Sequence, residues 1–179
     1  MKRLLALSAW DIAYSVSMAI ACLISYQIMT HALSGVVAND DKVLGGLWAT
    51  AATVFVYRDS RERSWSAGGA RFIATCVSFA LCLLYLIIVP FTPLGMALLL
   101  GIGTVVMMLL GRRDDIVTTG ITTAVVMVVA AMNPLDAWLQ PLLRLIDTVV
   151  GIAVGIGCKW IGSFVFDRYV AERKQSSLI

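Results

Sequence analysis

The sequence predicts an all-α, polytopic membrane protein whose six transmembrane helices form two inverted three-helix repeats. Of its 179 residues, 60% are hydrophobic and only 14% are charged, against about 25% charged residues in soluble domains. Six apolar stretches approach or exceed the roughly 17–25 residues of a spanning helix. The two halves of the chain also share residues at one constant spacing. Together these observations favour a duplicated bundle in a bilayer over a soluble domain.

The six apolar stretches are predicted to be helices at residues 12–33, 43–57, 71–89, 94–110, 116–132 and 145–166. The second, fourth and fifth are short and rich in Gly, Ala or Thr, which suits the interior of a bundle. We expect one membrane domain over residues 1–179, with repeat one at about 11–90, repeat two at about 91–166 and a cytoplasmic tail at 167–179. The first apolar run is too long for a signal peptide and has no clear cleavage site, so we expect it to be retained.

Basic residues fix the expected orientation, because Lys and Arg accumulate in cytoplasmic loops. With the N-terminus inside, the outer segments hold only Lys42 and Arg144. The inner segments hold all the other basic residues of the loops and ends: Lys2, Arg3, Arg58, Arg61, Arg63, Arg71, Arg112, Arg113, Arg168, Arg173 and Lys174. Both termini are therefore predicted to be cytoplasmic.

An internal duplication appears when the chain is shifted by 73 positions, since Arg71 then falls on Arg144 and Thr75 on Thr148. Trp65 falls on Trp138 at the same offset. Ala and Val matches are common in such a composition, but shared Trp, Arg and Thr matches are harder to attribute to chance. The offset covers three helices, and an odd number of crossings places the second copy upside down, as in many transporters. Arg71 would then lie at the cytoplasmic end of the third helix, and Arg144 would lie at the outer end of the sixth.

Polar or small residues share one face of the third and sixth predicted helices. This face carries Arg71, Thr75, Ser78, Cys82 and Tyr85 on the third helix, and Arg144, Asp147, Thr148, Gly151, Gly155 and Cys158 on the sixth. Lipid cannot satisfy such groups, so both stripes should face protein or a water-filled cavity. The spacing of Gly151 and Gly155 is typical of close helix packing, although passage of a substrate beside bare backbone is an alternative.

The pair Arg144 and Asp147 has two interpretations. Three residues apart on a helix, they can form a local ion pair that anchors the helix structurally. Alternatively, Arg144 attracts an anion and Asp147 exchanges a proton, because ionisable groups within a membrane mark ion and proton pathways. Lys159 is expected to extend its ammonium group to the cytoplasmic headgroups. Trp48, deeper than the interfacial Trp10, Trp65 and Trp138, packs in the core or stacks on an aromatic substrate.

No catalytic motif is present, and the loops are too short for an enzyme domain, so the sequence predicts no enzyme. The four cysteines fall inside the predicted spans without metal-ligand spacing and are interpreted as packing residues. No metal, cofactor or nucleic-acid site is expected. The basic cluster in YRDSRERSW is first a topology signal, with contact to anionic membrane lipids as an additional role.

Three segments resemble membrane motifs of the fusaric acid resistance, or aromatic acid exporter, family: Trp48-Ala49-Thr50, the Arg71–Thr75 pair, and Arg144-x-x-Asp147-Thr148-x-x-Gly151. The resemblance extends over about residues 40–165, with Ala74 and Ser78 standing where that family often has Gly. It implies a proton-driven exporter of aromatic carboxylates in a bacterial inner membrane. Larger members have a second six-helix unit, so we expect this chain to form a homodimer or higher oligomer.

The leading hypothesis is a secondary transporter that exports aromatic carboxylic acids or similar toxic organic anions, with proton coupling. Arg71, Thr75, Ser78, Arg144, Thr148 and Trp48 are its candidate substrate-binding residues, Asp147 its proton carrier, and Gly151 and Gly155 its packing positions. An anion channel is one alternative. The other is a non-transporting membrane subunit of a larger efflux assembly, which acts with a partner pump. A periplasmic efflux partner is a further interaction that we consider.

Overall fold

A computed structural model describes residues 9–35 and 37–176, with the side chains of residues 10–35 and 37–164. All regular structure in these residues is helical, which confirms the all-α prediction: α1 Ala9–Ala32, α2 Asn39–Val56, α3 Arg61–Ile88, α4 Pro93–Leu109, α5 Ile116–Met132 and α6 Leu139–Ser176, with 3-10 turns η1 Arg113–Asp115 and η2 Pro134–Asp136. Lys2, Arg3 and the side chains of Arg168, Arg173 and Lys174 lie outside this description, so their part in the orientation stays a prediction.

Four helical segments of the described residues are long and apolar enough to cross a membrane: Trp10–Ala32, Arg61–Ile88, Arg113–Met132 and Leu139–Phe164. The apolar helix α4 is shorter, with 17 residues, and the first turn of α2 carries Asp40 and Asp41. The chain is thus a helical membrane protein with several candidate crossings. Six crossings remain a prediction.

The bounds of α5 agree with the predicted 116–132, whereas α3 and α6 are longer than predicted. The third helix begins at Arg61 because Ser60 caps it, its side chain accepting a hydrogen bond from the Arg63 N–H at 3.2 Å. Arg71 therefore does not lie at the end of this helix. The sixth helix begins at Leu139, with Pro141 in its first turn, where the missing N–H costs nothing. It continues through Ser176, so most of the predicted tail is helical.

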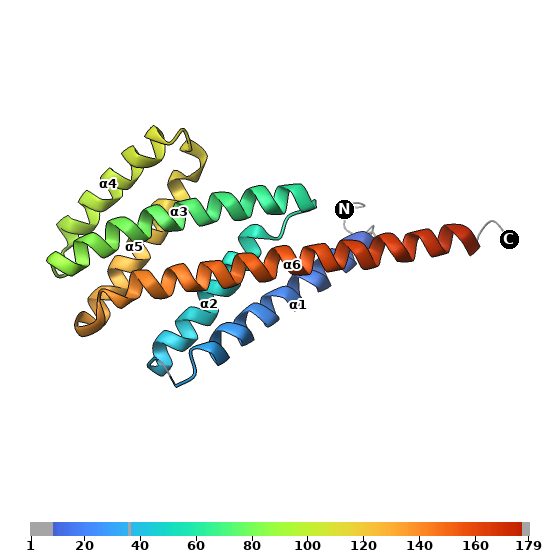
Figure 1. Cartoon of the computed structure of the whole chain (residues 1–179), viewed down its shortest axis with the longest axis horizontal. Coiled ribbons are helices and arrows are strands. Elements are labelled where there is room, and N and C mark those ends of the chain that lie inside the picture. Colours follow the sequence, from blue (N-terminus) through green and yellow to red (C-terminus); the bar gives the residue numbers. More distant parts are fainter. Residues whose placement is uncertain (1–8, 36, 177–179) are drawn as a thin grey trace, which may run out of the picture.

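The helices α3 and α6 lie side by side and run in opposite directions through the middle of the molecule (Figure 1). The pair α1 and α2 packs against α6, and the pair α4 and α5 packs against α3. These contacts are preserved when α1, α2 and α3 are exchanged with α4, α5 and α6: α2 with α6 becomes α5 with α3, and α1 with α6 becomes α4 with α3. Any two equivalent three-helix repeats would show this exchange, and the inverted relation between the halves stays a prediction.

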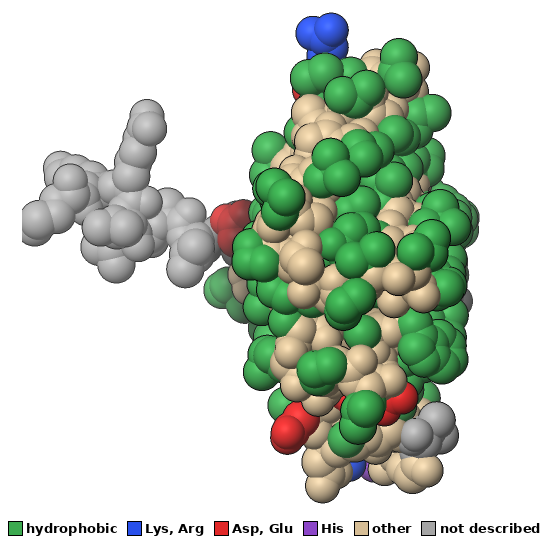
Figure 2. Space-filling model, turned by 90° about the vertical axis from the view of Figure 1, so that its left-hand side faces the viewer, with side chains coloured by type: hydrophobic (Ala, Val, Ile, Leu, Met, Phe, Trp, Pro, Cys, Tyr) green, Lys and Arg blue, Asp and Glu red, His purple; other side chains and the backbone are tan. Residues whose placement is uncertain are grey.

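The outside of the bundle is apolar. Leu84, Ile87, Leu94 and Leu109 are each more than 60% exposed, which suits contact with lipid chains. Figure 2 looks at the end of the molecule where α3 ends and α6 begins, and hydrophobic and neutral side chains dominate this face. Few Lys or Arg side chains appear there.

The interior is more polar than the outside. Two small apolar clusters exist, one around Met127 between α3, α4 and α5, and one around Met29 between α1, α2 and α6. Between them lie buried hydroxyl and charged side chains of α2, α3, α5 and α6: Thr53, Arg71, Thr75, Ser78, Thr119, Thr122, Thr123, Arg144, Asp147 and Thr148. Their hydrogen-bonding groups avoid lipid, which could not satisfy them.

Candidate functional site

The polar stripes of α3 and α6 are buried against protein, as their composition predicts. Arg71 is 6% exposed and Thr75 is fully buried on α3, while Arg144 is 4% exposed and Asp147 fully buried on α6. The helices meet at Thr75 and Thr148, whose Oγ1 atoms lie 3.5 Å apart. The two positions matched at the repeat offset thus touch each other, near the middle of α3 and in the first third of α6.

Ser78 connects α3 to α5 rather than lying in an open site. Its hydroxyl donates to the carbonyl of Thr119 at 3.0 Å and lies 2.8 Å from the Thr123 hydroxyl. The position that matches Ser78 at the offset of 73 is Gly151, whose carbonyl accepts a hydrogen bond from Thr53 at 3.0 Å. Both positions therefore join a long central helix to the second helix of the other half.

Gly151 and Gly155 are packing positions in the structure. A Cβ added at Gly151 would overlap the backbone carbonyl of Ala49 on α2, and one at Gly155 would lie 3.3 Å from the carbonyl of Thr53. The absence of side chains here lets α2 approach α6 closely, as small residues do in membrane helix pairs. This contact explains both glycines without a substrate beside them.

Arg144 lies between Asp147 and Trp48. Its Nη1 is 3.1 Å from Asp147 Oδ2, and neither atom has a hydrogen-bond partner among the described residues. The guanidinium carbon lies 4.3 Å from the centre of the Trp48 ring, a cation–π distance. A Cβ at Gly45 would lie 3.0 Å from Asp147 Oδ1, so the bare backbone of α2 makes room for this carboxylate.

Arg71 lies apart from this group, over a different aromatic ring. Its guanidinium carbon is 4.6 Å from the centre of Phe55 at the other end of α2. Its Nε has no hydrogen-bond partner among the described residues. Each matched arginine thus stacks on an aromatic side chain of α2. The sequence does not mark Phe55, because the residue whose guanidinium it contacts, Arg71, lies on another helix.

Lys159 was expected to extend its ammonium group to the headgroups, but its side chain lies inside the bundle. It is 3% exposed, and its Nζ lies 5.2, 5.1 and 5.4 Å from the ring centres of Trp10, Tyr14 and Tyr57. Long helix α6 carries the side chain past α1 and the end of α2, where these rings form a cage. The aromatic residues near the start of α1 and the end of α2 could have indicated a site for a buried cation, but aromatic residues at helix ends are also typical of a membrane interface.

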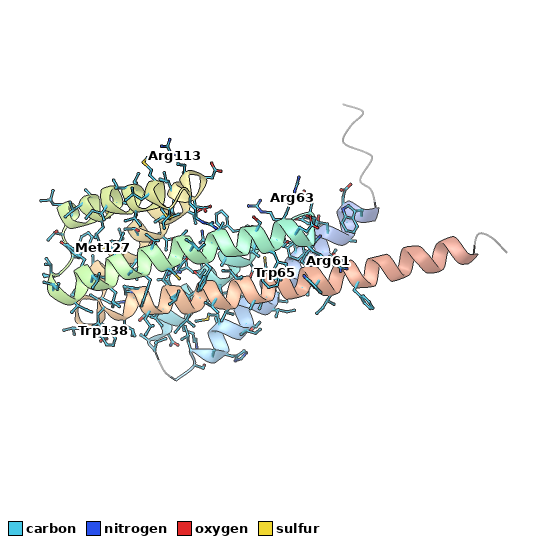
Figure 3. The ribbon with its side chains drawn as sticks, turned by 45° about the horizontal axis from the view of Figure 1, so that its top comes forward. Arg61, Arg63, Trp65, Arg113, Met127 and Trp138 are labelled. Carbon is cyan, nitrogen blue, oxygen red and sulfur yellow. The ribbon has the colours of Figure 1, made fainter. Side chains whose placement is uncertain are left out.

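Figure 3 shows the two ends of the bundle: Arg61, Arg63 and Trp65 lie at the beginning of α3, and Trp138 lies at the opposite end, before α6. No group of three or more His, Cys, Asp or Glu side chains within the described residues could hold a metal ion. The cysteines of the described chain are free thiols. The buried polar groups of the described residues are cations, the Asp147 carboxylate, hydroxyl groups and the Gln140 amide.

A model of the fusaric acid resistance protein-like family matches residues 20–158. The match includes α2 to α5 completely, most of α1, and α6 as far as Cys158. No curated protein and no solved structure matches the chain.

Proposed function

Because the chain belongs to the fusaric acid resistance protein-like family, we propose that it is a secondary transporter that exports aromatic carboxylates or similar organic anions. Proton coupling through Asp147 and residence in a bacterial inner membrane with both termini cytoplasmic are parts of this proposal. The membrane character rests on the apolar helices, and the role in transport on the family.

One observation carries the proposal. Two arginines at matched positions are buried on antiparallel central helices, and the threonines one turn further along those helices meet at 3.5 Å. A buried charge costs at least roughly 2.5–3.5 kcal/mol in a membrane helix, and a packing role does not require a cation. Two such cations, one in each half, suit an anion that is passed from one side to the other.

The neighbours of the two arginines support an aromatic anion as the substrate. Arg144 stacks on Trp48 and Arg71 on Phe55, so each cation lies beside a ring face that can also pack against an aromatic ligand. The hydroxyl groups of Thr75 and Thr148 lie between them along the helices and can donate hydrogen bonds to a carboxylate. Ser78 is committed to α5, so we assign it to packing rather than to the substrate.

Asp147 is the proposed proton carrier, because it is a fully buried carboxylate on the central helix α6. Its two oxygens accept no hydrogen bond from the described residues, and Arg144 is its ion-pair partner. A carboxylate held by one cation and no donor can exchange a proton more readily than one fixed in a full hydrogen-bond network.

Flux into and out of proteoliposomes tests the proposal. The parent protein should move radiolabelled benzoate, faster with an imposed pH gradient, whereas Arg144→Gln should transport at least about tenfold more slowly. Asp147→Asn should lose the acceleration by the pH gradient. Arg63→Gln is the matched control, since Arg63 is exposed and its ion-pair partner among the described residues is Asp59, at 3.7 Å. Parent-like flux and coupling in both site variants would contradict the assignment, and current far above carrier rates without coupling would indicate a channel instead.

A further inference from the structure

A cavity of about 200 Å³ lies beside Arg71, on the side of the bundle where α2 ends and α3 begins. Three elements line it: the end of α2 and the loop after it, the second and third turns of α3, and the start of α5. Its main lining residues are Phe55, Arg58, Ala70, Arg71, Asp115 and Thr118. The positive-inside pattern places this side in the cytoplasm.

The charges around the cavity favour an anion. Arg58 and Arg71 line it, and its one carboxylate, Asp115, already pairs with Arg112 at 3.0 Å, outside the lining. Arg71 is 6% exposed, and its Nε has no acceptor among the described residues. A buried guanidinium that pairs with no carboxylate of the described residues is costly, and a carboxylate in the cavity that Arg71 lines would pair with it.

The shape and the apolar lining favour a single aromatic ring. Ala67 and Ala70 leave space on the α3 side, and Phe55 presents a ring on the α2 side, 4.6 Å from the Arg71 guanidinium carbon. The cavity is smaller than the pockets of about 300–1,000 Å³ that hold drug-sized ligands. It therefore suits one ring with one carboxylate better than a larger amphiphile.

We infer that this cavity is the cytoplasmic loading site for a single-ring aromatic carboxylate, with Arg58 and Arg71 binding the carboxylate and Phe55 packing against the ring. The inference rests on the proposed function and adds to it a place, a substrate size and two residues, Phe55 and Arg58, that were not among the predicted substrate-binding residues.

The matching place in the other half is filled by the protein's own side chains. Where the first half has Ala67 and Arg71, the offset of 73 gives Gln140 and Arg144. Gln140 Nε2 donates to Asp41 at 3.2 Å, and Arg144 is occupied by Asp147 and Trp48. The structure thus has the form expected of a carrier that is open to ligand on one side and closed on the other.

Equilibrium dialysis of purified protein against radiolabelled benzoate tests the loading site. Phe55→Leu and Arg58→Gln should each weaken binding by about tenfold, the loss expected when a charge-assisted contact or a ring contact is removed. Phe72→Leu and Arg63→Gln should bind within about twofold of the parent, since Phe72 is as exposed as Phe55, at 44% against 46%, but lies outside the cavity. Benzamide, which has no charge, should not compete with benzoate, and cyclohexanecarboxylate should compete less well.

A cavity-filling variant shows whether a loss of binding comes from the cavity or from misfolding of the protein. Ala70→Leu adds apolar volume to the cavity without removing a charge, and it should abolish benzoate binding while the protein elutes as a single peak with the parent melting temperature. Undiminished binding in Ala70→Leu, Phe55→Leu and Arg58→Gln would overturn the loading site.

Flux measurements separate the two levels of the proposal. If Arg144→Gln and Asp147→Asn lose transport while the three cavity variants bind and transport like the parent, the loading site is wrong and the proposed function stands. If the parent protein neither binds benzoate nor transports any aromatic acid offered, both are wrong.

Discussion

The hydroxyl oxygens of Thr75 and Thr148 lie 3.5 Å apart, although 73 residues separate them in the chain. This separation equals the offset at which the two halves of the sequence match. In two inverted halves, residues that lie on the twofold axis meet their own counterparts, so a contact between matched residues locates that axis. The contact places the proposed axis between α3 and α6, with Arg71 and Arg144 on opposite sides of it.

Gly151→Ala should destabilise the bundle, because the added Cβ would overlap the carbonyl of Ala49 on α2. Overpacking of this kind costs about 1–3 kcal/mol. The matched control is Gly157→Ala on the same helix, where nothing lies within 4 Å of the added Cβ and the variant should be neutral or gain up to about 1 kcal/mol. Melting temperatures in one detergent compare the two. Equal melting temperatures would show that α2 does not approach α6 as described.

The Arg144–Asp147 pair allows its structural and functional roles to be separated. Removal of one partner leaves an unpaired buried charge, so Arg144→Gln alone should lower stability by about 3–5 kcal/mol. The double variant Arg144→Gln with Asp147→Asn should recover most of that loss, because both charges are gone. Thermal unfolding measures the recovery, and benzoate flux is then measured on the stable double variant. Restored stability without transport supports the functional role. Restored stability with full transport would show that the role of the pair is structural.

Lys159 should stabilise the contact of α6 with α1 and α2 through its three aromatic neighbours. Lys159→Met keeps the length of the side chain and removes the charge, which should cost about 0.5–2 kcal/mol. The effect should shrink when Tyr57 is already Leu, so a double-mutant cycle on melting temperatures detects the coupling. Lys42→Met, at the start of α2, is the comparison for the substitution itself. Additive effects of Lys159→Met and Tyr57→Leu would contradict the cage.

Much of the fold could be predicted from the sequence because lipid imposes simple rules. Apolar runs of sufficient length gave the six helices in their order, and α5 agrees with its predicted bounds of 116–132. The ends of α3 and α6 could not be predicted in this way. An apolar stretch ends where charged residues begin, as at Arg61–Arg71, and the predicted helix was therefore ended there. A capped helix can continue beyond the apolar stretch, because its backbone hydrogen bonds do not depend on hydropathy.

The candidate site was predicted in part. The helical period identified Arg71, Thr75, Arg144, Asp147 and Thr148 as members of two stripes, and all of them are buried. The helical period predicts which residues share one face of a helix, but it does not predict which other helix packs against that face. The partners Phe55, Gly45 and the three rings around Lys159 depend on how α1 and α2 cross α6, and that crossing is decided by packing between distant segments.

A reversible cross-link between α3 and α6 tests the central claim most directly. Thr75→Cys with Thr148→Cys should lose two free thiols on mild oxidation. Benzoate flux in proteoliposomes should then stop, and it should return to the level of the unoxidised variant when the bond is reduced, because the proposed carrier requires movement between its two halves. The control pair, Ile73→Cys with Ile146→Cys, has the same offset but should keep its thiols and its flux, since Ile146 is 41% exposed. Failure of the threonine-position pair to cross-link, or flux that persists in the fully oxidised protein, would contradict a shared transport path between α3 and α6.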